Sequence, residues 1–297
     1  MAKGRRVDGW LVIDKPAGIS SAATVNRVKW ALQAQKAGHS GTLDPAATGV
    51  LAIALGEATK TIPVLENVQK AYRFVVRWGQ ATNTDDAEGL VIASSDIRPD
   101  AATIRAALAR FVGDIQQVPP QFSAVKVGGE RAYALARAGE AMELAARPLR
   151  VESLVLLDQP DEDHAVFEMV CGKGGYVRAI ARDLGQVLGC LGHVVTLRRL
   201  WTGPFTLDWS VTLDQLEAPD RDRLLLPVRL ALQHLPELIC APDQVRHLRN
   251  GGSLNYQADL SDGEACWASD RGRPVAVGRY SGKAFVPQRV LAAPDVH

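Results

Sequence analysis

The sequence predicts an α+β fold, because segments with strand periodicity and segments with helix periodicity follow one another without the regular alternation of a Rossmann fold or a TIM barrel. No repeat of roughly 20–50 residues and no low-complexity tract interrupts them. Strands are expected at residues 11–13, 50–55, 71–78, 151–157, 164–171 and 194–201. Helices are expected from residue 21 to Gly38, and at residues 103–111, 131–139 and 177–188.

Two of these segments are the most regular. Residues 71–78 alternate between large apolar side chains and arginines, which is typical of a half-buried strand. Residues 177–188 carry a continuous apolar stripe that Gly189 ends, which is typical of an amphipathic helix. Arg178 and Arg182 lie one turn apart on a neighbouring face of this helix, where either a solvated or a functional role fits the pattern.

Composition indicates a folded globular protein of average character. The chain has 297 residues, of which 47% are hydrophobic and 23% are charged, and its formal net charge is +1. The charge is unevenly distributed. Residues 1–44 carry seven Lys or Arg against three Asp, and residues 170–205 carry five against one Asp. Two such stretches could fold together into one basic cleft or form ordinary solvated faces.

The pattern changes near residue 232. Residues 233–297 contain one short expected helix, at 243–250, followed by Gly251-Gly252 and by several short strands separated by Gly, Asp and Pro. This is typical of a small β-barrel-like module. We therefore expect a larger domain at residues 1–232 and a smaller one at residues 233–297.

The cysteines and the N-terminal residues indicate an intracellular setting. None of the four cysteines forms a C-x-x-C pair, so neither a zinc knuckle nor a redox motif is expected. Asp8, Asp14 and Lys15 stand where a signal peptide would need an unbroken apolar core. The longest apolar runs are far shorter than a membrane span. We expect a cytoplasmic protein with reduced thiols.

Residues 38–49 form the most informative segment, with the sequence Gly-His-Ser-Gly-Thr-Leu-Asp-Pro-Ala-Ala-Thr-Gly. The segment is expected as a loop between a helix that Gly38 ends and a strand that starts at Val50. Asp44 is its only acid, and Pro45 stiffens the chain beside it. Taken alone, an Asp before Pro is more often a turn or cap residue than a functional one.

Taken together with other segments in the same order, residues 38–49 resemble the catalytic motif of the bacterial tRNA pseudouridine-55 synthases of the TruB type. The other matching segments are residues 10–21 with a Lys-Pro-x-Gly turn, Lys70-Ala71-Tyr72, residues 117–133, and residues 171–185. The resemblance spans about residues 9 to 205. A looser match, from Gly251-Gly252 to Val290, is to an RNA-binding module of the PUA type.

The resemblance implies a role for each matching residue. Asp44 would be the nucleophile, Arg178 would pair with its carboxylate, and Tyr72 would stack on the target base and is a candidate for moving the proton from C5. The residues implied for contact with RNA are His39, Tyr176, Leu197, Lys15, Pro16 and Asp86. Taken singly, Tyr72 could instead be a half-buried core residue and His39 a loop cap.

The chemistry of isomerisation makes these residue types sensible. A carboxylate can hold one fragment covalently while the N-glycosidic bond breaks and the base rotates. A guanidinium keeps a carboxylate ionised, and its planar fork can hold the carboxylate at two points. The target base must leave its stack to be reached. The chain contains no Walker A or G-x-G-x-x-G sequence and no metal-ligand cluster, so neither a cofactor nor a metal is expected.

The chain departs from the family pattern at a few positions. Gly172 and Gly175 stand where the family usually has Ser and Thr, Asn83 replaces a preferred Asp, and Ser40 replaces a usual Thr. The loop at residues 172–175 could be a plain turn or a phosphate cradle at the start of the following helix.

The resemblance implies a pseudouridine synthase fold, with a mixed, mainly antiparallel sheet, flanking helices, a central cleft and a C-terminal PUA-like module. It also implies a monomeric enzyme that acts on uridine-55 in the T arm of tRNA. Two alternatives stay open: a synthase for another RNA uridine, and an RNA-binding or tRNA-folding protein without catalysis. The residues do not decide whether Asp44 attacks the sugar C1′ or the base C6.

Overall fold

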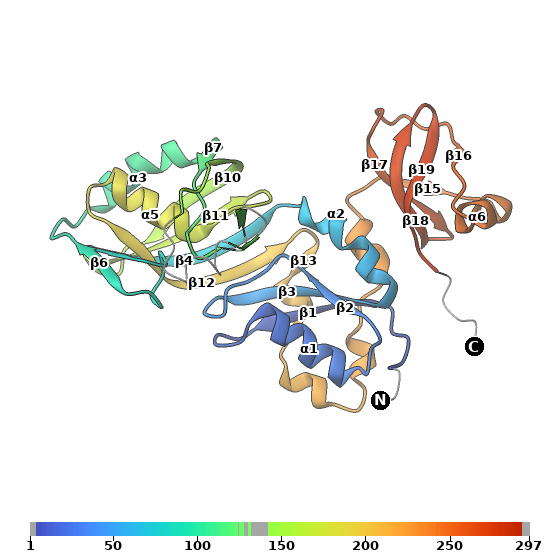
Figure 1. The fold of residues 1–297 in the computed structure, drawn as a ribbon, viewed down its shortest axis with the longest axis horizontal. Helices are drawn as coiled ribbons and strands as arrows, with labels where there is room; N and C mark the ends of the chain where they lie inside the picture. The colour runs from blue at the N-terminus through green and yellow to red at the C-terminus, as the bar shows by residue number, and fades with distance from the viewer. Residues whose placement is uncertain (1–3, 124, 128–129, 132–141, 293–297) are drawn as a thin grey trace.

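The computed structural model describes residues 4–123, 125–127, 130–131 and 142–292, and its largest element is a mixed, ten-stranded sheet (Figure 1). Its strands run in the order β14-β1-β3-β12-β4-β11-β10-β7, with β2 paired to β3 and β13 to β12. All pairs are antiparallel except β1 with β14 and β3 with β12. The bounds are β1 (Gly9–Lys15), β2 (Ala37–Ser40), β3 (Thr48–Leu55), β4 (Lys70–Trp78), β7 (Gly113–Gln117), β10 (Arg147–Asp158), β11 (His164–Cys171), β12 (Gly192–Thr202), β13 (Phe205–Thr206) and β14 (Ser210–Val211). The expected mixed, mainly antiparallel sheet is confirmed.

Few helices accompany this sheet. They are α1 (Ser21–Ala31), α2 (Ile62–Glu66), α3 (Ala101–Leu108) and α5 (Val177–Val187), with short 3₁₀ turns η1 (Gly56–Thr61), η2 (Ala109–Phe111), η3 (Leu207–Trp209), η4 (Asp214–Glu217), η5 (Arg221–Leu224) and η6 (Val228–Leu232). Two of the helices start at side-chain caps. Ser20 accepts a hydrogen bond from the backbone N–H of Ala23, and Asp100 accepts one from that of Thr103. None of the helices in the described part of the chain has the length and apolar character needed to cross a bilayer.

A second sheet of five strands lies near the C-terminus, at one end of the molecule (Figure 1). Its order is β15-β17-β18-β19-β16, with β15 (Glu237–Ile239), β16 (Leu254–Asn255), β17 (Ala265–Asp270), β18 (Arg273–Ser281) and β19 (Ala284–Val290), and the helix α6 (Pro242–Arg249) packs on it. Two ribbons complete the strands: β5 (Gln80–Thr82) with β6 (Val91–Ser94), and β8 (Lys126–Val127) with β9 (Glu130–Arg131).

The hydrophobic pattern of the sequence places the core correctly. Along β4, alternate apolar side chains from Tyr72 to Trp78 are buried while Arg73 and Arg77 are exposed. The apolar stripe of α5 joins the same buried cluster as β4. Packing thus fixes which side chains lie on each face of the sheet whose strands line the cleft described below.

Two expectations about local structure need correction. The first helix ends at Ala31 and not at Gly38, because Gln33 takes a positive φ of 49° and the chain then returns as β2 along the edge of β3. The loop expected at residues 38–49 is therefore confined to residues 41–47. The helix expected at residues 131–139 is not found at Arg131, which lies in β9, and residues 132–139 lie outside the described residues.

Candidate active site

A cleft of about 550 Å³ opens where the loop between β2 and β3, the strands β4 and β12, and the start of α5 meet. Six of the site residues predicted from the sequence line this cleft: His39, Asp44, Tyr72, Tyr176, Arg178 and Leu197. They come from segments far apart in the chain, which the sheet order brings together because β12 lies between β3 and β4. Pro16 does not line the cleft; it is exposed in the turn that follows β1.

Hydrogen bonds from the end of β1 and the start of α1 hold the loop that carries Asp44. The Nζ of Lys15 donates to the carbonyl oxygens of Pro16, Ile19 and Pro45 at 2.9, 2.8 and 3.0 Å. Ser21 also binds the loop, because its Oγ donates to the Leu43 oxygen at 2.9 Å and accepts from the Leu43 nitrogen at 2.8 Å. These bonds fix the loop on both sides of Asp44.

Lys15 therefore does not have the role that the sequence suggested. Its side chain is completely buried, and its hydrogen bonds go to backbone oxygens, so it cannot contact RNA directly. Burial lowers the pKa of Lys15 to about 8, although the negative charge of Asp44 acts in the opposite direction. Through these hydrogen bonds, Lys15 stabilises the loop that carries Asp44.

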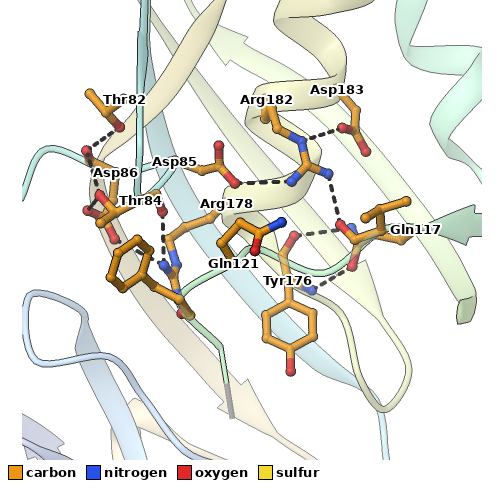
Figure 2. Close-up of polar contacts among 12 residues, drawn as sticks. Thr82, Thr84, Asp85, Asp86, Gln117, Gln121, Tyr176, Arg178, Arg182 and Asp183 are labelled. Carbon is orange, nitrogen blue, oxygen red and sulfur yellow. Dashed lines mark hydrogen bonds and ion pairs between the residues drawn. The ribbon is translucent and has the colours of Figure 1, made fainter. Parts of the chain in front are cut away.

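Arg178 lies in the first turn of α5 and is buried, so the interpretation as a solvated surface residue is wrong. Its Nε lies 3.0 Å from Oδ2 of Asp44. One terminal nitrogen donates to the carbonyl oxygen of Thr84 at 2.9 Å and lies 3.3 Å from Oδ2 of Asp86. The other donates to the carbonyl oxygen of Phe122 at 2.9 Å. Figure 2 shows the side chain of Arg178 extending from the helix towards Thr84 and Asp86.

The contact between Arg178 and Asp44 differs from the expected two-point fork. Only Nε faces the carboxylate, and the fork of terminal nitrogens is used to hold the guanidinium itself. The direction of Arg178 is thus set by two separate chain segments, the turn that contains Thr84 and Asp86 and the segment that contains Phe122. Asp86, implied as an RNA contact, lies behind Arg178 and does not line the cleft.

Asp44 also has a different electrostatic balance from the expected one. Burial raises the pKa of the Asp44 carboxyl above its ordinary value, and the negative charge of Asp86 adds to this. The positive charges of Arg178 and Lys15 act against the rise without reversing it. The side chain is nevertheless 41% exposed, because it faces the open cleft. This combination suits a carboxylate that must be reached by a substrate and is only weakly stabilised by its surroundings.

Tyr72 and His39 form the walls near Asp44. Tyr72 is only 7% exposed, so the core interpretation and the cleft interpretation both hold for it. Burial raises the pKa of its phenol, which is therefore protonated at neutral pH. Burial likewise lowers the pKa of His39, which favours the neutral imidazole. The Nδ1 of His39 is buried and has no partner among the described residues.

The start of α5 is organised by Gln117, which holds the backbone of Tyr176. The amide nitrogen of Gln117 donates to the Tyr176 oxygen at 3.1 Å, and its amide oxygen accepts from the Tyr176 nitrogen at 2.9 Å (Figure 2). Arg182, one turn after Arg178, lies 3.1 Å from Asp85 and 2.8 Å from Asp183. The two arginines thus lie on one side of α5 but form ion pairs with different carboxylates, Arg178 with Asp44 and Arg182 with Asp85.

Three positively charged residues that line the cleft were not predicted as site residues from the sequence: Lys70, Lys173 and Arg199. Arg199 is 1% exposed and Lys70 is 7% exposed, and burial lowers the pKa of Lys70 to about 8. A charged residue at an inward position of an apolar strand is a detectable signal, and Arg199 fits it within residues 194–201. The expected convergence of two basic stretches holds only for residues 170–205, because the described Lys and Arg side chains of residues 1–44 do not line the cleft.

The departures from the family pattern have local explanations. A Cβ added at Gly175 would lie 2.6 Å from the Sγ of Cys171, so glycine fits this position closely, whereas a Cβ at Gly172 would meet no atom nearer than 3.7 Å. The Oδ1 of Asn83 accepts from the backbone N–H of Leu90 at 2.9 Å and closes the turn between β5 and β6. Over the described ranges, no cluster of His, Cys, Asp or Glu has the make-up of a metal site.

Solved structures share this fold over nearly the whole chain. A chain in the structure of an H/ACA RNP bound to a substrate RNA containing 2′-deoxyuridine has a TM-score of 0.77 at 22% identity, covering 97% of this chain and 86% of that one. An archaeal box H/ACA sRNP Nop10–Cbf5 complex gives a TM-score of 0.75 at 23% identity, covering 97% and 87%. At these identities the likeness establishes the fold alone.

Comparison with proteins of similar sequence identifies the family of this chain. The family model described as TruB family pseudouridylate synthase (N terminal domain) matches residues 29–177, and tRNA pseudouridylate synthase B C-terminal domain matches residues 178–233. The proteins named tRNA pseudouridine synthase B from Ruegeria pomeroyi and Roseobacter denitrificans are 60% and 57% identical, each covering 99% of this chain and 98% of the relative. The fold is that of the pseudouridine synthases. The chain belongs to the TruB family.

Proposed function

We propose that the protein isomerises uridine-55 in the T arm of tRNA to pseudouridine, with Asp44 as the nucleophile. The observation that carries the proposal is the ion pair between Asp44 and Arg178, 3.0 Å apart, on the wall of a cleft that also contains Tyr72. A binding protein needs no accessible carboxylate with a raised pKa held by a buried guanidinium. The relatives of 50–60% identity that are named tRNA pseudouridine synthase B support tRNA as the substrate.

The roles of the cleft residues follow from their positions. The Asp44 carboxylate forms the covalent bond that retains one fragment while the glycosidic bond breaks. Arg178 opposes the effect of burial on the pKa of Asp44. It also orients the carboxylate, since each of its terminal nitrogens is anchored to the backbone. Tyr72 offers a ring for stacking on a base that has left the helix, and Leu197, Tyr176 and His39 close the pocket around that base.

The C-terminal part extends the surface available to RNA. We assign residues 1–232 to catalysis and residues 233–297 to a PUA-like RNA-binding module, because the second sheet has its own buried cluster, which includes Leu238, Leu248 and Phe285. Recognition of the T arm rests on its folded shape and on splayed bases, as is usual for RNA. The enzyme works as a monomer in the cytoplasm, and no cofactor takes part.

The test is to map pseudouridine in an unmodified tRNA transcript incubated with the purified protein. The proposal predicts a single product at position 55, and a transcript with cytidine at that position gives none. Product at another uridine would favour a synthase of different specificity. Binding of the transcript without any product would favour a tRNA-binding or tRNA-folding protein.

A further inference from the structure

Arg199 occupies a position between the two proposed catalytic groups. On β12 it lies directly opposite Tyr72 of β4, and on its other side it pairs with Gly49 of β3. A Cβ at Gly49, whose φ is 98°, would lie 2.2 Å from the carbonyl oxygen of Arg199, so only glycine allows this approach of the two strands. Arg199 is therefore fixed by backbone pairing on both sides.

The guanidinium of Arg199 ties the two ends of the Asp44 loop together. Its Nε donates to the carbonyl oxygen of Val50 at 2.7 Å, and one terminal nitrogen donates to that of Gly41 at 3.1 Å. Asp44 lies between these two attachment points. A buried arginine whose bonds go to neutral carbonyl oxygens keeps a full positive charge in the wall of the cleft, since arginine does not lose its proton in proteins.

The same guanidinium lies on the same cleft wall as the phenol of Tyr72, because Arg199 and Tyr72 are directly opposite each other on β12 and β4. The positive charge of Arg199 lowers the pKa of the phenol against the larger effect of burial. The other groups that face the phenol are Cys171 of β11 and Asp44, and both act to raise its pKa. Burial raises the pKa of Cys171 to about 11, so its thiol is neutral. Arg199 is thus the group that favours a phenolate at this position.

We propose that Arg199 is a positioning residue that holds Tyr72 beside the Asp44 loop and stabilises the Tyr72 phenolate while Tyr72 carries one proton between two atoms of the base. The inference rests on the proposed function. As the N1–C1′ bond breaks, its electron pair stays on N1 and C1′ bonds to the Asp44 carboxylate. The Tyr72 hydroxyl gives its proton to N1 and becomes a phenolate beside Arg199.

The second half of the reaction returns the proton. Rotation of the base about its N3–C6 axis exchanges the places of N1 and C5. C5 then bonds to C1′ and displaces the Asp44 carboxylate. The phenolate takes the C5 proton, and the electron pair of that C–H bond restores the conjugation of the ring. One fixed tyrosine therefore serves both steps, and no outside acid or base is needed.

Single-turnover rates of Arg199→Met and Arg199→Lys at saturating tRNA test this inference. Removing a preorganised donor from a developing anion costs about 10²–10³-fold in rate, which we expect for Arg199→Met. Arg199→Lys retains the charge without reaching both carbonyl oxygens, so its loss is smaller. Arg73→Met is the matched control, since Arg73 is exposed on the other face of β4, where it lies 3.0 Å from Glu168. Its rate should match the wild type.

Deuterium at C5 of the target uridine separates proton transfer from a purely structural effect. With Arg199 replaced, the Tyr72 phenolate forms more slowly but is a stronger base towards C5. A primary isotope effect smaller than in the wild type is therefore expected, and the smallest in Arg199→Met. An unchanged isotope effect, or a loss of tRNA affinity as large as the loss of rate, would overturn the inference. That result leaves the proposed function intact when the wild type forms pseudouridine, whereas a wild type without product refutes the proposed function itself.

Discussion

The cleft and the C-terminal sheet have opposite kinds of interior. Around the cleft, four cations are buried, namely Lys15, Lys70, Arg178 and Arg199. Within the described residues of the C-terminal sheet, the buried residues are apolar apart from Ser269. Burying a charge costs free energy unless hydrogen bonds and opposite charges compensate. The interior of the C-terminal sheet therefore contributes to stability, whereas the interior around the cleft retains charges that the proposed chemistry uses.

Among the variants that compare the two regions, Arg178→Lys has the largest expected effect on turnover. Lysine keeps the charge but cannot bind the Thr84 and Phe122 carbonyl oxygens and Asp44 at once, so Asp44 loses its fixed direction. We expect turnover at saturating tRNA to fall by about 10²-fold, since displacements near 1 Å have costs of that order. Arg182→Lys is the matched control, one turn further along α5, and should lose much less. Equal turnover in wild type and Arg178→Lys would remove Arg178 from the site.

The C-terminal sheet should respond in the opposite way. Leu248→Ala removes a completely buried side chain from α6 and should lower the free energy of unfolding by about 2–5 kcal/mol. Denaturant melts would measure this. Turnover at saturating tRNA, corrected for the folded fraction, should stay near the wild-type value because Leu248 is far from the cleft lining. A turnover defect comparable with that of Arg178→Lys would show that the two regions are not separable.

The pH dependence of the rate reports on Asp44 directly. Asp44 must be ionised to act, and burial raises its pKa, so the rate should fall with decreasing pH through a value above that of an ordinary aspartate. The negative charge of Asp86 contributes to this rise. Asp86→Asn should therefore move the acid limb to lower pH, whatever it does to the maximum rate. A limb that stays in place or moves to higher pH contradicts this electrostatic account.

The smallest expected effect is at Lys173, on the rim of the cleft. Its side chain is exposed, and it can approach a phosphate by exchanging its surface ion pair with Glu66, which lies 2.9 Å away. Lys173→Gln should weaken tRNA binding and reduce the slope of log Kd against log salt by about one, without changing turnover at saturating tRNA. A slope that does not change would mean that Lys173 contacts no phosphate.

The same contrast explains what the sequence could predict. Alternation in residues 71–78 and the stripe in residues 177–188 identified β4 and α5, because burial of apolar surface depends on local periodicity. The strand β2 was not predicted at all, because its pairing with the edge of β3 outweighs the local helix-end and loop signals around Gly38. Sequence order also could not show that Arg199 faces Tyr72, since cross-strand register joins residues distant along the chain.

The candidate site divides in a similar way. Asp44, Tyr72 and Arg178 were nominated by motif resemblance, and the structure brings them to one cleft. Lys15 was assigned to RNA because a motif gives residue types without their burial, whereas its amine is enclosed by three carbonyl oxygens. The net rise in the pKa of Asp44 depends on how much desolvation opposes two nearby cations, which only three-dimensional distances determine.

The most direct test of the central claim compares Asp44→Asn with the wild type in one single-turnover experiment on tRNA. We expect pseudouridine formation to fall by about 10⁴-fold or more, as when other enzymes lose a member of the nucleophilic unit. Affinity for tRNA should be unchanged. The raised pKa means that ionised Asp44 costs stability at neutral pH, a cost present once the pH exceeds the folded-state pKa, so Asn should not lower the Tm. Retained product formation, or parallel losses of Tm and affinity, would contradict the claim that Asp44 is the nucleophile.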